Sequence, residues 1–77
     1  MRFTEKQGQY LAYIYTYTKI HRQPPAEADI AFFFRASAPS VHQMIVRLGE
    51  LKLISRQPRQ ARSIKVLVPQ EELPILR

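Results

Sequence analysis

The chain has 77 residues, enough for one small domain but too few to enclose a large active site. It contains no cysteine, which excludes disulfides and thiolate metal sites. The first residues lack the apolar core of a signal peptide, and no apolar run approaches membrane-spanning length. We therefore expect a cytoplasmic protein with no membrane contact. Twelve Lys and Arg against six Asp and Glu give a net charge of +6, which suits a polyanionic partner.

The N-terminal stretch predicts a helix from about Glu5 to about Arg22. Thr4 followed by Gln7 has the form of a capping box, in which each side chain accepts a hydrogen bond from the other residue's backbone N–H. Two consecutive prolines after this segment stop the helix. Its core-facing stripe contains three residues at helical spacing: Tyr10, Leu11 and Ile14.

Residues 26–35 predict a short second helix that is unusually rich in aromatic side chains. Three of its residues can face the core together: Ile30, Ala31 and Phe34. Phe32 lies roughly opposite that face, and Phe33 lies at its margin. Because contiguous exposed aromatic residues are unusual on a small monomer, Phe32 and Phe33 are candidates for a contact with a partner.

Residues 37–51 predict a third helix with two distinct faces. Ser37 can cap the helix and Pro39 suits its first turn. An apolar stripe at the spacing of a half-buried helix contains Val41, Met44, Ile45, Leu48 and Leu51. The opposite face carries side chains that are short or form hydrogen bonds, namely Pro39, His42, Gln43, Val46 and Glu50, with Ser40 and Arg47 at its edge.

This third helix has the character of a recognition helix. The major groove of DNA admits one helix and displays hydrogen-bond donors, acceptors and thymine methyl groups. Basic residues also follow closely, because six of the twelve cations lie within residues 47–65, where Glu50 is the only acid. An ordinary amphipathic helix with a solvated outer face is the alternative interpretation.

A β-hairpin is predicted after the helices. Residues 53–57 look extended, residues 58–61 form a polar turn, and residues 63–68 form a strand in which Ile64, Val66 and Val68 share one face. The predicted fold is therefore mainly α with a small β-hairpin (α+β), a three-helix winged helix-turn-helix. We expect the domain to span residues 1–68, and residues 69–77 to form a tail that packs on the domain or on a dimer partner.

The wing would carry three arginines, Arg56, Arg59 and Arg62, to the DNA backbone or the adjacent minor groove. A hairpin whose charges serve only solubility is the alternative.

Four segments carry a family resemblance: Phe3-Thr4, residues 24–31 (Pro-Pro-Ala-Glu-Ala-Asp-Ile-Ala), residues 38–42 (Ala-Pro-Ser-Val-His), and Leu48 followed by Leu53-Ile54. In this order and spacing they resemble the N-terminal DNA-binding domain of LexA-type repressors, and they are similar to small MarR-like winged-helix regulators. The resemblance covers about Phe3 to Val68. It implies a winged fold whose third helix enters the major groove.

The sequence departs from the LexA pattern in ways that matter. The stretch from Pro39 to Ile45 is one residue shorter, so base-reading positions do not transfer one by one. Lys52 stands where many relatives have glycine, which predicts a non-glycine residue at positive φ. Ala26 replaces a hydroxyl cap, at a cost of about 1 kcal/mol. The chain has no sequence from which the self-cleaving domain of LexA could be built, so we expect no autoproteolysis.

No catalytic or metal-binding pattern is evident, and we predict neither enzymatic activity nor a cofactor. His21 and His42 are far apart and have no third candidate ligand nearby in the sequence. Glu27 and Asp29, at i and i+2 of a helix, point in different directions and suit the helix dipole better than acid–base chemistry. Gly49, inside the third helix, is interpreted as a place where a neighbouring backbone approaches closely.

Two hypotheses of function follow. The first is sequence-specific binding of double-stranded DNA by a transcriptional regulator, with base-reading residues His42, Gln43 and Val46 and backbone-contacting residues Ser37, Ser40, Arg47, Arg56, Arg59 and Arg62. The second is a protein-interaction module or homodimer whose contact residues are Phe32, Phe33, Leu73, Ile75 and Leu76. Winged helices serve both roles, and both hypotheses hold if the protein dimerises.

Overall fold

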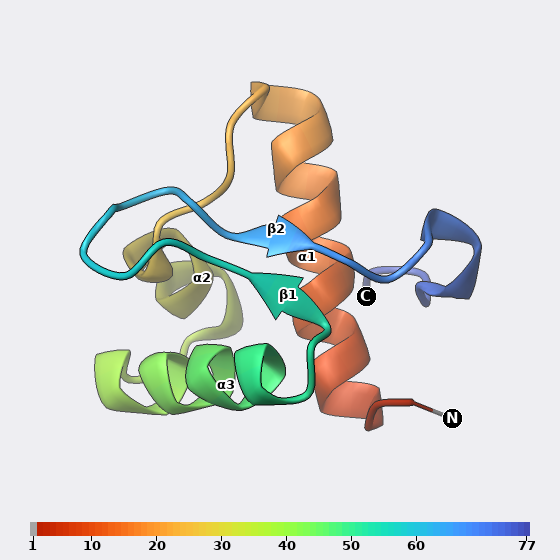
Figure 1. Ribbon diagram of the computed structural model, residues 1–77, viewed down its shortest axis with the longest axis horizontal. Coiled ribbons are helices and arrows are strands. Elements are labelled where there is room, and N and C mark those ends of the chain that lie inside the picture. The colour runs from red at the N-terminus through yellow and green to blue at the C-terminus, as the bar shows by residue number, and fades with distance from the viewer. Residues whose placement is uncertain (1) are drawn as a thin grey trace.

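The computed structural model describes residues 2–77 as three helices followed by a two-stranded antiparallel hairpin. The elements in chain order are α1 (Glu5–His21), α2 (Glu27–Phe34), α3 (Ala38–Glu50), β1 (Ile54–Ser55), β2 (Lys65–Val66) and the 3₁₀ turn η1 (Gln70–Glu72). In Figure 1, α1 stands through the centre, α3 lies to the left of its lower part, and the hairpin loop extends to the left above α3. The predicted winged helix-turn-helix is confirmed.

Helix α1 begins and ends as its sequence predicts. The Gln7 backbone N–H donates to Thr4 Oγ1 at 3.1 Å, and the Thr4 backbone N–H donates to Gln7 Oε1 at 2.9 Å, which completes the capping box. At the other end Arg22 adopts a left-handed conformation with φ 61°. Its backbone N–H donates to the Thr18 carbonyl, which satisfies one of the last carbonyl groups of the helix.

Helix α2 starts without a hydroxyl cap because Ala26 occupies the N-cap position. Asp29 compensates in part: its carboxylate accepts a hydrogen bond from the Ala26 backbone N–H at 2.9 Å. The helix ends after eight residues at Arg35, whose φ of 54° turns the chain towards α3. Lys52, just beyond α3, also has a positive φ of 61°, as its place in the sequence predicts.

The core lies where the three helices meet the hairpin. Its buried hydrophobic residues come from the three helices, from β1 and from positions that flank the two strands: Tyr10, Leu11, Ile14, Ile30, Val41, Ile45, Leu48, Leu53, Ile54, Ile64 and Val68. The Tyr10 ring stacks on Phe34 with the ring centroids 4.3 Å apart, which joins α1 to α2. Burial of these side chains supplies the main stabilisation of so small a domain.

The hairpin is shorter than predicted. Only two residue pairs form the regular ladder, Ile54 with Val66 and Ser55 with Lys65, and the Leu67 N–H adds a bond to the Leu53 carbonyl at 2.9 Å. The prediction of a strand across residues 63–68 is therefore wrong in its extent. The cause is Ser63, whose hydroxyl accepts from the Gln57 N–H at 2.9 Å and so occupies a backbone donor that a longer ladder would need.

The tail folds back along α1. The Gln9 side chain donates to the Ile75 carbonyl and accepts from the Arg77 backbone N–H, both at 2.9 Å. Arg77 forms an ion pair with Glu5. In Figure 1 the tail lies on the opposite side of α1 from the hairpin loop. The boundary between the domain and its tail at residue 68 stays a prediction.

The two glycines differ in their surroundings. A Cβ added to Gly8 would meet Phe3 Cε1 at 3.0 Å and Pro74 Cγ at 3.1 Å, so Gly8 lets the tail and Phe3 approach α1. A Cβ added to Gly49 would meet nothing within 4 Å. The interpretation of Gly49 as the site of close approach is wrong, and at Gly8 it is the side chains of Phe3 and Pro74 that approach closely. Within residues 2–77, no helix combines the length and the apolar character needed to cross a membrane.

This difference predicts opposite outcomes for the same substitution. Gly49→Ala should stabilise the fold by roughly 0.5–1 kcal/mol, because alanine has the higher helix propensity and the site is open. Gly8→Ala should give no such gain, because the Phe3 ring and Pro74 must move away. Urea unfolding of both variants measures the two free energies. Equal stabilisation by both would show that the tail does not pack against Gly8.

Candidate nucleic-acid interface

The outer face of α3 is set by the burial of its inner face. Val41, Ile45 and Leu48 are fully buried, and they fix the rotation of the helix about its axis. His42 and Gln43 are exposed, and Val46 is half-buried on the same outer side. The three predicted base-reading residues therefore lie on one accessible face of the helix that a major groove can accommodate.

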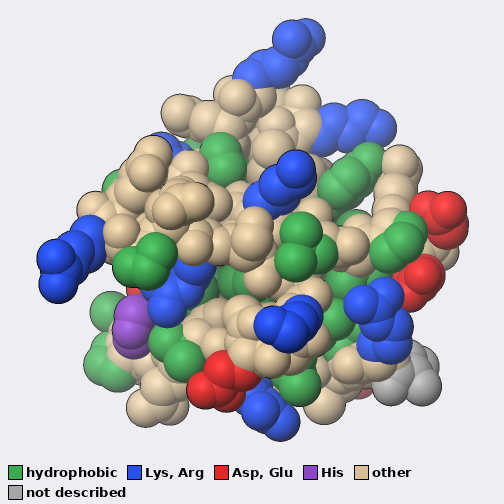
Figure 2. Space-filling view, viewed as in Figure 1, with side chains coloured by type: hydrophobic (Ala, Val, Ile, Leu, Met, Phe, Trp, Pro, Cys, Tyr) green, Lys and Arg blue, Asp and Glu red, His purple; other side chains and the backbone are tan. Residues whose placement is uncertain are grey.

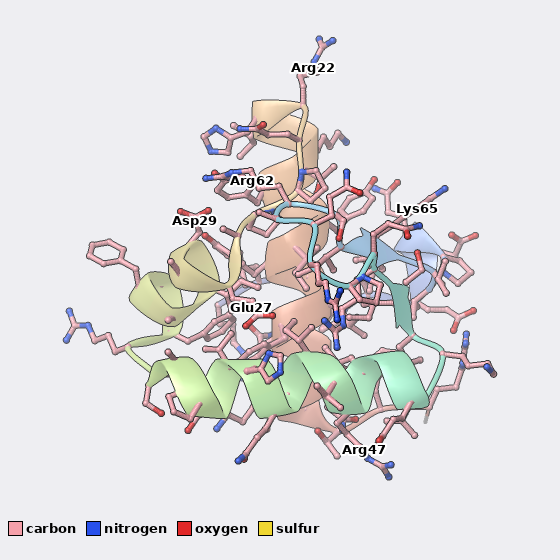
Figure 3. All side chains as sticks on the ribbon, turned by 60° about the vertical axis from the view of Figure 1, so that its left-hand side comes forward. Arg22, Glu27, Asp29, Arg47, Arg62 and Lys65 are labelled. Atoms are coloured by element: carbon pink, nitrogen blue, oxygen red, sulfur yellow. The ribbon has the colours of Figure 1, made fainter. Side chains whose placement is uncertain are left out.

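His42 has a partner on α2. Its Nδ1 atom lies 3.2 Å and 3.3 Å from the two carboxylate oxygens of Glu27. In Figure 3 the Glu27 carboxylate lies between α2 and α3. This contact joins the outer face of α3 to the start of α2, and residues fifteen positions apart in the sequence make it.

The residues predicted to hold phosphates begin at the start of α3. Ser37 Oγ accepts from the Ser40 backbone N–H at 3.2 Å and lies 2.8 Å from Ser40 Oγ, so the two exposed hydroxyls form the N-terminal cap. Near the end of the helix Arg47 forms an exposed ion pair with Glu50 at 3.4 Å. In Figure 3, Arg47 points away from α3 on the side opposite Glu27.

The wing, defined as residues 56–63, is a structured loop. The Gln60 N–H donates to the Gln57 carbonyl at 3.1 Å, and Arg59 between them has φ 65°, the pattern of a type II turn with Pro58 in second place. The Ser63 hydroxyl lies 2.9 Å from the Gln60 carbonyl and closes the loop. Arg59 is exposed at the tip of this turn.

Arg62 differs from the other wing arginines because its guanidinium turns inward. It lies 3.1 Å from the Asp29 carboxylate, 3.1 Å from the Tyr17 hydroxyl and 3.2 Å from the Pro24 carbonyl. The pKa of Arg62 is raised mainly by the hydrogen bond with Tyr17, and the carboxylate of Asp29 raises it further. We call this group of four residues the Arg62 brace; Figure 3 shows Arg62 beside Asp29. Arg62, which the sequence predicts to contact the DNA backbone, thus connects the wing to α1 and α2.

A pocket of about 400 Å³ lies between the wing, the start of α2 and α3. Four side chains that carry or can carry positive charge line it, together with the Glu27 carboxylate: His42, Arg56, Arg59 and Arg62. Figure 2 shows that Lys and Arg side chains outnumber Asp and Glu across the visible face of the molecule. The surface formed by α3 and the wing therefore suits the phosphates of a nucleic acid.

The predicted partner-contact residues separate into two groups. Phe32 is 88% exposed, and Phe33 is 43% exposed with its ring stacked on Tyr13 at 4.4 Å between centroids. Burial and the charge of Asp29 raise the pKa of Tyr13. The second group lies in the tail, where Leu73 and Leu76 are half-buried and Ile75 is 86% exposed. Leu73 packs against the core of its own chain.

The sequence alone did not predict the partners of two acids. Glu27 and Asp29 point in different directions, as their spacing predicts, but each has a specific partner, His42 for Glu27 and Arg62 for Asp29. These partners lie 15 and 33 positions away along the chain, so no local spacing connects them. Asp29, three residues after Ala26, is the acidic half of a capping box. This spacing is the signal in the sequence that indicates a structural contact of Asp29.

A three-helix core, an exposed polar face on α3 and a basic wing beside it define a winged helix-turn-helix DNA-binding domain. The chain belongs to the iron dependent repressor, N-terminal DNA binding domain family, whose model matches residues 2–61. It is also similar to the LexA repressor of Thermosipho melanesiensis, with 31% identity over 72 residues. That match covers 94% of this chain but only 36% of the LexA repressor. The predicted repressor-type winged domain is confirmed, and the family is one of DNA-binding domains.

The description of the family names iron, which proteins commonly bind through His, Cys and carboxylate side chains. Among residues 2–77, no three such side chains come together as ligands. The contact of His42 with Glu27 joins two of them at exposed positions. The described residues therefore do not fit a bound iron ion, and we assign none of them as its ligand.

The Arg62 brace predicts different effects for two neighbouring arginines. Arg62→Ala should loosen the wing, because it removes the contacts of the guanidinium with Tyr17, Pro24 and Asp29. Faster amide hydrogen exchange across residues 56–63 would show this loosening. Arg59→Ala, which changes an exposed side chain on the same loop, should leave exchange there unchanged. Equal exchange rates in both variants would contradict the brace.

Proposed function

We propose that this protein binds specific sequences of double-stranded DNA to regulate transcription, with α3 in the major groove and the wing on the backbone. One observation carries the proposal most directly. His42, on the exposed face of α3, and the arginines of the wing line the same pocket, between α2, α3 and the loop. A duplex that receives α3 in its groove would bring an adjacent phosphate strand to Arg59.

Three residues of α3 are proposed to read bases. Gln43 can form two hydrogen bonds with adenine N6 and N7, and Val46 can contact a thymine methyl group. His42 reads the edge of a base through its second ring nitrogen. All three side chains extend from the face opposite the buried stripe of α3, which holds their backbone in place.

A second group of residues is proposed to hold the phosphates: Ser37, Ser40, Arg47, Arg56 and Arg59. The hydroxyls lie at the N-terminus of α3, where the helix dipole favours negative charge. Arg62 is proposed to position the wing through the Arg62 brace, and its role in binding is therefore indirect. If four to six phosphates are neutralised, log K should fall with log[salt] with a slope of roughly −4 to −5.

Base reading and phosphate binding can be separated by two substitutions. Gln43→Ala should weaken binding by about 1–3 kcal/mol on the preferred site and have little effect on random DNA, because it removes a base contact. Arg59→Ala should weaken binding to all sequences alike and make the salt slope shallower by about one unit. Selection from a random duplex pool supplies the preferred site, and titrations at several salt concentrations measure both effects.

The outcomes that contradict the proposal are distinct. A selection that enriches no sequence would remove sequence-specific binding from the proposal. Equal losses on preferred and random DNA for Gln43→Ala would show that Gln43 does not read a base. An unchanged salt slope for Arg59→Ala would remove the tip of the wing from the interface.

A second candidate function is protein contact, and the exposure of Phe32 favours it. At 88% exposure, nearly the whole ring faces solvent beside the half-exposed Phe33. Burying such surface is worth about 25 cal/mol per Å², so two copies of the chain gain by meeting there. A dimer would also pair two recognition helices on a palindromic site with half-sites about one helical turn apart.

The dimer proposal predicts a concentration-dependent mass. Sedimentation equilibrium across micromolar concentrations should show a monomer–dimer equilibrium for the wild type, and Phe32→Ser should shift it to the monomer. Ile20→Ser is the matched control, because Ile20 is also a large exposed apolar residue, at 68%, and is not among the predicted contact residues. A monomeric mass for the wild type at every concentration would contradict a dimer.

A further inference from the structure

The contact between Glu27 and His42 is not required by the packing of the core. Both side chains are substantially exposed, at 37% for Glu27 and 57% for His42. Together they place a carboxylate on a surface that otherwise attracts phosphates, where negative charge opposes binding. Because the Glu27 carboxylate repels phosphates, we looked to its contact with His42 for a contribution to DNA recognition that offsets this repulsion.

We propose that Glu27 determines which base His42 reads, by fixing the tautomer of the His42 ring. Glu27 is thus a positioning residue for specificity, and this inference rests on the proposed function of α3 as the recognition helix. A neutral imidazole carries its proton on either Nδ1 or Nε2, and the other nitrogen is a hydrogen-bond acceptor. The tautomer therefore decides whether His42 offers a donor or an acceptor to DNA.

The geometry selects one tautomer. Nδ1 lies 3.2 Å and 3.3 Å from the two oxygens of the Glu27 carboxylate, and an ionised carboxylate only accepts hydrogen bonds. In the neutral ring the proton is therefore held on Nδ1, where it donates to Glu27. Nε2, on the other side of the ring, is left with a free lone pair.

An acceptor at Nε2 matches only part of the pattern of the major groove. It pairs with the exocyclic amines, adenine N6 and cytosine N4, and it has no favourable contact with guanine O6 and N7 or thymine O4, which are themselves acceptors. We therefore expect His42 to favour adenine or cytosine at the position it contacts. One such hydrogen bond corresponds to roughly a threefold to tenfold preference in affinity.

The charged neighbours of His42 do not provide an alternative acceptor for Nδ1. The other charged groups that line the same pocket are Arg56, Arg59 and Arg62, and a guanidinium only donates hydrogen bonds. On α3 itself, Glu50 is paired with Arg47. Among the described residues, Glu27 is the only acid that lines this pocket.

The tautomer can be measured directly in the free protein. In a ¹⁵N-labelled sample in mildly alkaline buffer, long-range ¹H–¹⁵N correlation spectra should show the His42 proton on Nδ1. Glu27→Ala should convert His42 to a mixture of tautomers. His21, on α1 beside Tyr17, is an internal control whose signals should not change. Identical tautomer populations for His42 with and without the Glu27 carboxylate would overturn the inference.

The effect on specificity is measured with duplexes that carry each of the four bases at the position where His42→Ala changes the preference. The wild type should favour adenine or cytosine there, and Glu27→Ala should reduce this preference to near equality. In a His42→Ala background, the further change Glu27→Ala should have no effect on base preference, because Glu27 acts through His42. Glu50→Ala, which removes the same charge from α3, should alter affinity for all four bases equally.

The remaining outcomes separate this inference from the proposed function. If the wild type prefers no base at any position, the proposed function fails. If it is selective but Glu27→Ala changes all four affinities equally, as Glu50→Ala does, only the role of Glu27 fails. Because Glu27 begins α2, Glu27→Met is a second variant that keeps a helix-forming side chain of similar length without the carboxylate acceptor. A base preference retained in folded Glu27→Met would also overturn the inference.

Discussion

The fully buried stripe of α3 is the constraint on which the interface depends. Val41, Ile45 and Leu48 have no exposed surface, and each is packed into the core that α1, α2 and the hairpin share. Rotation of α3 by even one position would expose apolar side chains and bury polar ones, at a cost of several kcal/mol. The orientation of the proposed base-reading residues is therefore a consequence of hydrophobic burial on the other side of the same helix.

The wing has little stability of its own and depends on contacts with the helices. Two ladder pairs alone do not hold a hairpin in water. Ile64 and Val68 anchor its returning strand in the core, and the Arg62 brace attaches its loop to α1 and α2. Asp29 links these parts, because its carboxylate accepts a hydrogen bond from the Ala26 N–H and forms an ion pair with Arg62. The weak cap of α2 and the position of the wing thus share one side chain.

The arginines of the wing differ in their partners. Arg62 has internal partners, while Arg59 extends from a turn held by Ser63 and is available to a phosphate. Exposed ion pairs such as that of Arg47 with Glu50 contribute little to stability, so this arginine can exchange its partner for a phosphate at small cost. Stability in this domain therefore comes mainly from the core. Among the described residues, Arg56 and Arg59 form no ion pair.

The sequence by itself determined the helices, the winged fold and the two faces of α3, because capping residues, prolines and helical periodicity act over a few neighbouring positions. It also predicted the positive φ of Lys52. Only the tertiary structure decided the contact of Glu27 with His42, the inward turn of Arg62 and the close approach of the tail at Gly8. These contacts join residues that are distant along the chain, and their partners are chosen by how the elements pack. Local patterns carry no information about that packing. The sequence alone therefore did not predict the contacts of Arg62 with α1 and α2, and it placed the close approach at Gly49.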